Sequence, residues 1–152
     1  MLQKGSRGKN QSGAAVVETA LCLSFVVLPV VFGTIGYAYM LSFRQGISQS
    51  AAEGARAAAV APSSASITDR TTAATNAVNA AIASAPGDLS CGVNNLTCTV
   101  VQVPNCGNGS AHDCMRVTIS YPYRDHSLVP SVPGLGITLP STITYSATAE
   151  IS

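Results

Sequence analysis

The chain has 152 residues, of which 10% are charged, and its formal net charge is +1. Such a low charge density argues against broad electrostatic recognition of nucleic acid, so we expect no nucleic-acid partner. A third of the chain lies in or near a membrane-length apolar segment. About 90 to 110 residues remain beyond that segment, which is enough for one small domain.

The N-terminal third combines a short basic leader with a long uncharged segment. Lys4, Arg7 and Lys9 come first, and the 25 residues from Thr19 to Phe43 contain no charged side chain. As a helix this segment is about 37 Å long, against a hydrocarbon core of about 30 Å. A cleaved Sec-type signal has a shorter apolar region, of about 7 to 15 residues. The length therefore predicts a membrane anchor, and the basic leader predicts a cytoplasmic N-terminus with the rest of the chain outside.

A single acid, Glu18, lies at the start of this apolar segment. Because a carboxylate at that depth is energetically costly, it usually has a pairing or assembly role. Gly13 is followed by four small or aliphatic residues, and Glu18 stands at the fifth position. Together with the leader and the apolar run, this spacing resembles the class III signal peptides of type IV pilins and pseudopilins. In that family a membrane prepilin peptidase cleaves after the glycine, which here implies cleavage between Gly13 and Ala14.

Nearly the whole chain resembles TadE-like pseudopilins of tight-adherence (Tad, or Flp) pilus systems. The residues that carry it are Glu18, Pro29, Gly33, Tyr37 and the Ala-rich stretch 51–59 with Glu53 and Arg56. The C-terminal part also resembles that of such proteins. It consists of residues 117–123, a Pro-rich link and a last alternating segment that ends near Glu150. Where the short major pilins have Tyr after the Glu, this chain has Thr19, which with its length favours a minor subunit.

The resemblance also implies a mechanism and a set of partners. Removal of the leader gives Ala14 a free ammonium group, and Glu18 of a neighbouring subunit pairs with it in low dielectric, which sets the register between subunits. Alternatively, Glu18 only snorkels to the membrane interface. The implied partners are a prepilin peptidase, other pilins and pseudopilins, an assembly platform in the bacterial inner membrane, a cytoplasmic ATPase acting through that platform, and membrane lipid.

Apolar periodicity predicts a single helix over residues 14–61. Residues that recur every four positions give its second half a narrow stripe of small side chains for a head domain to pack on: Phe43, Ile47, Ala51, Ala55 and Ala59. Gly46 and Gly54 each cost about 1 kcal/mol of helix propensity relative to Ala, so we expect close packing or bending there. Pro29 removes one backbone hydrogen bond and predicts a kink or a locally melted turn, either tolerated or used as a flexible point in assembly.

Residues 62–152 are expected to form an exported α+β head. Pro62 ends the first helix, and a second helix follows, capped by Thr68 or Asp69, with an apolar stripe from Ala74 to Ala85. After Gly87 the apolar period changes to two, which predicts a roughly three-stranded antiparallel sheet with one packed face. The alternation assigns three sets to shared faces: Thr99, Val101 and Val103; Val117, Ile119, Tyr121 and Tyr123; and Ile143, Tyr145, Ala147, Ala149 and Ile151. Thr142, Thr144, Ser146 and Thr148 then face water.

Four cysteines, Cys91, Cys98, Cys106 and Cys114, lie within 24 residues of one another. An even number in a small exported module indicates disulfides, and four cysteines allow three connectivities. We favour Cys91 with Cys98 and Cys106 with Cys114, because each pair closes a short loop; each bridge is worth about 2 to 4 kcal/mol. A zinc site from Cys106, His112 and Cys114 fits no standard finger spacing, so we expect no metal.

We find no catalytic constellation in the sequence. His112 and His126 are the available bases near neutral pH, and neither lies in a recognisable motif. We expect no enzymatic activity and no cofactor. A loop rich in Pro and Gly, from Pro130 to Pro140, is interpreted as a long connection between the second and third strands. Alternatively, it forms a surface that faces a partner.

Taken with the resemblance, these patterns imply a processed pseudopilin. Its expected role is structural: it acts in pilus initiation, capping or assembly, and thereby supports adhesion and biofilm formation. The alternative is a membrane-anchored extracytoplasmic binding module with an uncut signal anchor. The two differ at the leader, because a pseudopilin loses residues 1–13 and an anchored module keeps them.

Overall fold

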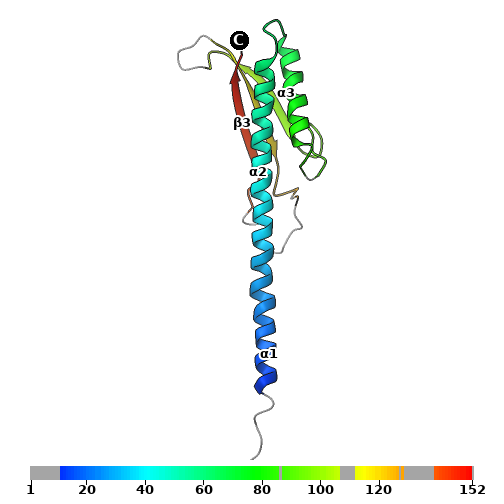
Figure 1. Cartoon of the computed structure of the whole chain (residues 1–152), viewed down its shortest axis with the longest axis vertical. Helices are drawn as coiled ribbons and strands as arrows, with labels where there is room; N and C mark the ends of the chain where they lie inside the picture. Colours follow the sequence, from blue (N-terminus) through cyan, green and yellow to red (C-terminus); the bar gives the residue numbers. More distant parts are fainter. Residues whose placement is uncertain (1–10, 86, 107–111, 127, 129–138, 152) are drawn as a thin grey trace, which may run out of the picture. The chain divides into compact units, whose positions relative to one another are not determined.

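The α+β architecture predicted from the sequence is confirmed by a computed structural model, which describes residues 11–85, 87–106, 112–126, 128 and 139–151. The elements in chain order are α1 (Gln11–Cys22), the π-helical segment η1 (Leu23–Val27), α2 (Leu28–Val60), α3 (Ile67–Ile82), β1 (Thr97–Val103), β2 (Cys114–Tyr121) and β3 (Ile143–Glu150) (Figure 1). The chain divides into two units, one ending at Ala38 and one beginning at Tyr39. Leader residues 1–10 and residues 129–138 of the Pro-rich loop lie outside the described part.

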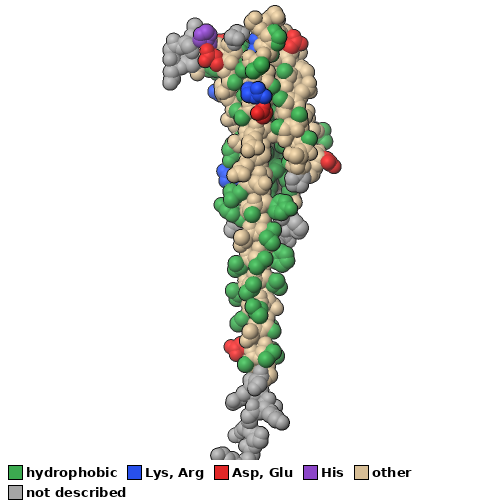
Figure 2. Space-filling model, viewed as in Figure 1, with side chains coloured by type: hydrophobic (Ala, Val, Ile, Leu, Met, Phe, Trp, Pro, Cys, Tyr) green, Lys and Arg blue, Asp and Glu red, His purple; other side chains and the backbone are tan. Residues whose placement is uncertain are grey.

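The N-terminal unit has the surface expected of a membrane span. Among the described residues, the helix Gly13–Val60 is long and apolar enough to cross a membrane. Large apolar side chains of this unit are exposed, Phe25 to 76%, and hydrophobic side chains follow the visible face of the helix (Figure 2). The hydroxyls of Thr19 and Thr34 donate to carbonyls one turn earlier, at 2.9 and 2.8 Å. These polar groups are therefore satisfied within the helix and do not oppose a lipid environment.

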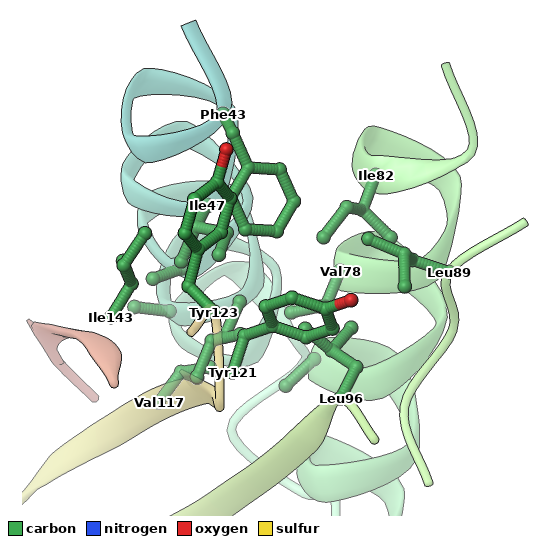
Figure 3. Close-up of a cluster of buried hydrophobic side chains, with 14 of the residues drawn as sticks. Phe43, Ile47, Val78, Ile82, Leu89, Leu96, Val117, Tyr121, Tyr123 and Ile143 are labelled. Atoms are coloured by element: carbon green, nitrogen blue, oxygen red, sulfur yellow. The ribbon is translucent and has the colours of Figure 1, made fainter. Parts of the chain in front are cut away.

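In the second unit, α2 and α3 lie side by side against one face of the sheet (Figure 1). Side chains from both helices and from the sheet meet in one core (Figure 3). The period of four predicted for α2 is confirmed, because Phe43, Ile47, Ala51 and Ala55 are all buried. Ala58, expected beside this stripe, is buried too, and Ala59 is half-buried. The head therefore packs on a stripe composed mostly of small residues.

The sheet has the order β1-β2-β3, and both pairs of strands are antiparallel. The predicted faces of β2 and β3 are confirmed: Val117, Ile119 and Tyr121 are buried, and the Thr and Ser residues of β3 are exposed. The face assigned to β1 is wrong, because Thr99 and Val101 are exposed. The register explains the difference: β1 places Val100 opposite Val117 and Cys98 opposite Ile119, and residues paired directly across a sheet share a face.

Three aromatic rings lie at one end of the core, where α2 meets the sheet (Figure 3). The ring centroid of Phe43 lies 5.2 Å from that of Tyr121 and 5.6 Å from that of Tyr123. The Tyr121 hydroxyl donates to the carbonyl of His126 at 2.8 Å. Burial raises the pKa of both tyrosines, and the neighbouring Tyr121 raises that of Tyr123 further. These edge and tilted contacts add to the area that the rings bury.

Helix α3 begins with a capping box. Its N-cap lies two or three residues before the cap predicted at Thr68 or Asp69. The N-cap is Ser66, whose hydroxyl accepts from the Asp69 N–H, while the Asp69 carboxylate accepts from the Ser66 N–H. Asp69 is therefore the third helical residue of the box rather than the cap. Hydrogen bonds from the Ser66 hydroxyl and then from its backbone N–H lower the pKa of the Asp69 carboxyl.

A buried arginine on α3 binds the end of α2. Arg70 is only 3% exposed. Its Nη1 donates to the carbonyl of Ala58 at 2.8 Å and its Nη2 to the carbonyl of Pro62 at 2.9 Å. The last carbonyls of a helix have no partner within the helix and carry its negative dipole end. The guanidinium therefore caps α2 and fixes the start of α3 against it.

The two glycines of α2 differ in what surrounds them. A Cβ at Gly54 would lie 2.6 Å from Cγ2 of Val78 and 3.2 Å from the carbonyl oxygen of Ala74, both on α3. A Cβ at Gly46 would meet no atom within 4 Å. Close packing therefore accounts for Gly54 but not for Gly46.

We predict opposite effects of alanine at these two positions. Gly54→Ala is expected to destabilise the head by about 1 to 2 kcal/mol, because overpacking outweighs the gain in helix propensity. Gly46→Ala is expected to stabilise the head by up to about 1 kcal/mol. The measurement is the free energy of unfolding of the full-length protein in detergent micelles, followed by near-UV circular dichroism in urea. Equal stability of the two variants would contradict the close contact at Gly54.

We also predict that the Arg70 cap is a major contact of the head. Arg70→Met keeps an apolar stem but leaves two carbonyls without their charged donor, so the expected loss is about 2 to 3 kcal/mol. Arg70→Lys should lose less, since one charge remains. The matched control is Arg56→Met, because Arg56 is 68% exposed and its ion pair among the described residues is with Glu53, so its loss should stay below about 0.5 kcal/mol. The same denaturation experiment measures these losses of stability. Similar losses for Arg70→Met and Arg56→Met would contradict the role of Arg70 as a cap.

Candidate processing and assembly site

The peptide bond between Gly13 and Ala14 lies in the first turn of α1, and both residues are exposed. No atom lies within 4 Å of the place where a Cβ of Gly13 would stand. Among the described glycines, positive φ occurs at Gly87 and Gly92 and not at Gly13. Neither packing nor backbone conformation within the described chain therefore accounts for a glycine at this position.

Glu18 lies one helical turn after Ala14. Residues four apart share a face of a helix, with Cβ atoms about 5 to 6 Å apart. The Glu18 side chain is exposed, and the described residues give its carboxylate no hydrogen bond and no ion pair. The expected pairing partners Ala14 and Glu18 are thus on one face, with the acid open to a group from outside the chain.

Among the residues that the structure describes, no cation lies near Glu18 in the sequence. Residues 11–43 contain no Lys, Arg or His, and the first basic side chain after the leader is Arg44. Arg44 stands 26 residues after Glu18. Once the leader is set aside, a positive partner for Glu18 must therefore be a chain terminus, another protein or a lipid group.

The helix irregularity expected at Pro29 takes the form of a π-helical turn. Pro29 has no N–H to donate to the carbonyl of Phe25, and its ring crowds that carbonyl. Phe25 is the middle residue of η1, and a π-helical turn is wider than an α-helical one. The helix then continues to Val60 as α2. The chain accommodates the proline by widening one turn and not by melting.

The four head cysteines form two disulfides, in the pairing favoured from loop size. Cys91 joins Cys98 with a Cα–Cα distance of 5.3 Å, and Cys106 joins Cys114 with 5.8 Å. The Cys91 N–H donates to the side-chain oxygen of Asn79 at 2.8 Å, which ties the first bridge to α3. Because Cys106 and Cys114 are bonded to each other, neither is a free thiolate for the zinc site considered above.

The other titratable groups form no evident chemical site. His112 Nδ1 lies 3.7 Å from the Glu150 carboxylate, and both side chains are exposed. His126 is also exposed. The described part of the chain has no group of three or more His, Cys, Asp or Glu side chains placed to hold a metal ion.

Two arginines have contacts that the sequence did not reveal. Arg70 caps α2, and Nε of Arg44 donates to the hydroxyl of Tyr145 at 3.1 Å. The guanidinium carbon of Arg44 lies 5.9 Å from the centre of the Tyr145 ring. The one sequence signal for Arg44 is its place directly after the uncharged run.

Residues 13–56 match the model of a protein family described as TadE-like protein. No curated protein and no solved structure matches the chain. The family match begins at the glycine of the expected cleavage site and ends in α2. It confirms the predicted resemblance to TadE-like proteins over these residues.

Proposed function

We propose that this TadE-like chain is a minor pilin or pseudopilin, a structural subunit that acts in initiation, capping or assembly of a Tad-type pilus. The observation that carries the proposal is the family match over residues 13–56, since it includes Gly13, Glu18 and the whole apolar run. The exposed apolar surface of that helix supports a membrane anchor. Support for adhesion and biofilm formation follows from a pilus role.

In this proposal a prepilin peptidase removes residues 1–13. An exposed glycine that the described chain itself does not require is consistent with recognition by such an enzyme. The scissile bond lies in the first turn of α1, where backbone N–H groups have no partner within the helix, so little energy is needed to open it. The mature chain then has one helical segment, residues 14–61, whose first half spans the inner membrane with its N-terminus cytoplasmic. The second half of that segment packs on the exported head, residues 62–152.

Cleavage also creates the missing cation. The α-ammonium group of Ala14 becomes the first positive charge of the mature chain and is followed by none before Arg44. Glu18 of a neighbouring pilin subunit is then its natural partner, and in a low-dielectric bundle this pair fixes the axial register. The inner-membrane platform and, through it, a cytoplasmic ATPase act on the assembled subunits.

The first test is the N-terminal residue of the mature protein. We expect intact mass and terminal peptide sequencing of membrane-extracted protein to show a start at Ala14 when the native prepilin peptidase is present. The full leader should remain when the peptidase gene is deleted. A retained leader in both strains would contradict processing and favour the anchored binding module.

The second test concerns the charge at position 18. Glu18→Gln keeps the size of the side chain but removes its charge, so we expect loss of co-purification with other pilins and loss of piliation. Cleavage should persist, because the scissile residues are unchanged. Glu53→Gln is the control, since Glu53 is an exposed acid on the same helix. If Glu18→Gln and Glu18→Ala leave both co-purification and piliation intact, the pairing role is wrong.

A further inference from the structure

A shallow, open depression lies on the second unit between α2 and β3. It is lined by Leu41, Arg44, Gln45, Ser48, Gln49 and Tyr145. Each of its polar side chains carries a hydrogen-bond donor, one is a cation, and none is a carboxylate. This composition is suited to an anion that is rich in oxygen atoms.

The cation of this depression is held in place. Arg44 uses Nε to donate to the Tyr145 hydroxyl, and its guanidinium stands over the Tyr145 ring. The two Nη groups make no hydrogen bond to the described residues. A planar guanidinium fork with free Nη groups matches the geometry of phosphate oxygens.

The depth of Arg44 on the helix indicates where such a phosphate is found. Arg44 follows directly after the uncharged run Thr19–Phe43, which has the length of a membrane span. A cation directly after such a span is expected in the headgroup region of the membrane. Leu41, one turn before Arg44, is 40% exposed and continues the apolar surface toward the lipid chains.

We propose that this depression binds the headgroup phosphate of an anionic phospholipid in the outer leaflet of the membrane that the helix spans. Arg44 supplies the charged fork, and Gln45, Ser48 and Gln49 supply further donors. The acyl chains lie beside Leu41 and the apolar run. Because Tyr145 belongs to β3, the bound lipid holds the sheet of the head at the membrane surface. The proposal rests on the membrane span, and its test does not depend on processing or piliation.

The test is a lipid titration of the full-length protein in detergent micelles, followed by native mass spectrometry. The probes are dioleoylphosphatidylglycerol, dioleoylglycerol (the same chains without phosphate) and inorganic phosphate. We expect saturable binding of one phosphatidylglycerol, and about a tenfold loss of affinity in Arg44→Gln, as for one charge-assisted contact. Tyr145→Phe, which removes the hydroxyl that positions Arg44, should show a smaller loss. Arg56→Gln is the matched control and should bind as the wild type does.

Three results would overturn the proposal. Equal binding of dioleoylglycerol would mean that only the acyl chains are recognised. Binding of inorganic phosphate with the affinity of the lipid would indicate a site for free anions. Unchanged lipid binding in Arg44→Gln, with loss of self-association instead, would make the depression a contact between subunits. Near-UV circular dichroism of each variant checks that the head remains folded, and Arg44→Lys, which keeps the charge, should recover part of the affinity.

Discussion

The structure of the head depends on how closely α2 approaches α3. With Gly54 at the contact, Val78 and the Ala74 carbonyl come nearer to α2 than a side chain at position 54 would allow. Dispersion contacts at this distance are individually weak but numerous, so the small residues of α2 let the core pack densely. The same approach brings Arg70 to the end of α2, where its guanidinium donates to the carbonyl of Ala58 in the last turn and to that of Pro62 just beyond it.

Much of this fold was predictable because its elements have clear periods. The period of four marked the face of α2, and strict alternation marked β2 and β3. In β1 the signal is ambiguous, since Val100 and Val101 are adjacent and either face is apolar. Pairing with β2 selects Val100, because Val117 opposite it is buried. A period identifies a strand, but only its partner identifies its inner face when both faces carry apolar residues.

The candidate site could be proposed from the sequence for a related reason. Gly13, Ala14 and Glu18 form a motif within six residues, so their spacing is visible in the sequence. The contacts of Arg44 and Arg70 join residues that are 101 and 12 positions apart. An isolated arginine has many potential acceptors, and the order of strands and helices decides which one it meets. Such contacts therefore require the tertiary structure.

The polar groups of the apolar helix suggest how it combines insertion with recognition. Thr19 and Thr34 bond to carbonyls of their own helix, so they add no demand for outside partners. Glu18 has no such internal partner among the described residues, and it stands at the start of the uncharged run. A helix whose two threonine hydroxyls are bonded internally, and whose one carboxylate is open, has its charged group at one depth. Apolar packing along the rest of the span is tolerant of sliding, whereas one charge pair in low dielectric is not, so in the proposed assembly the acid sets the register.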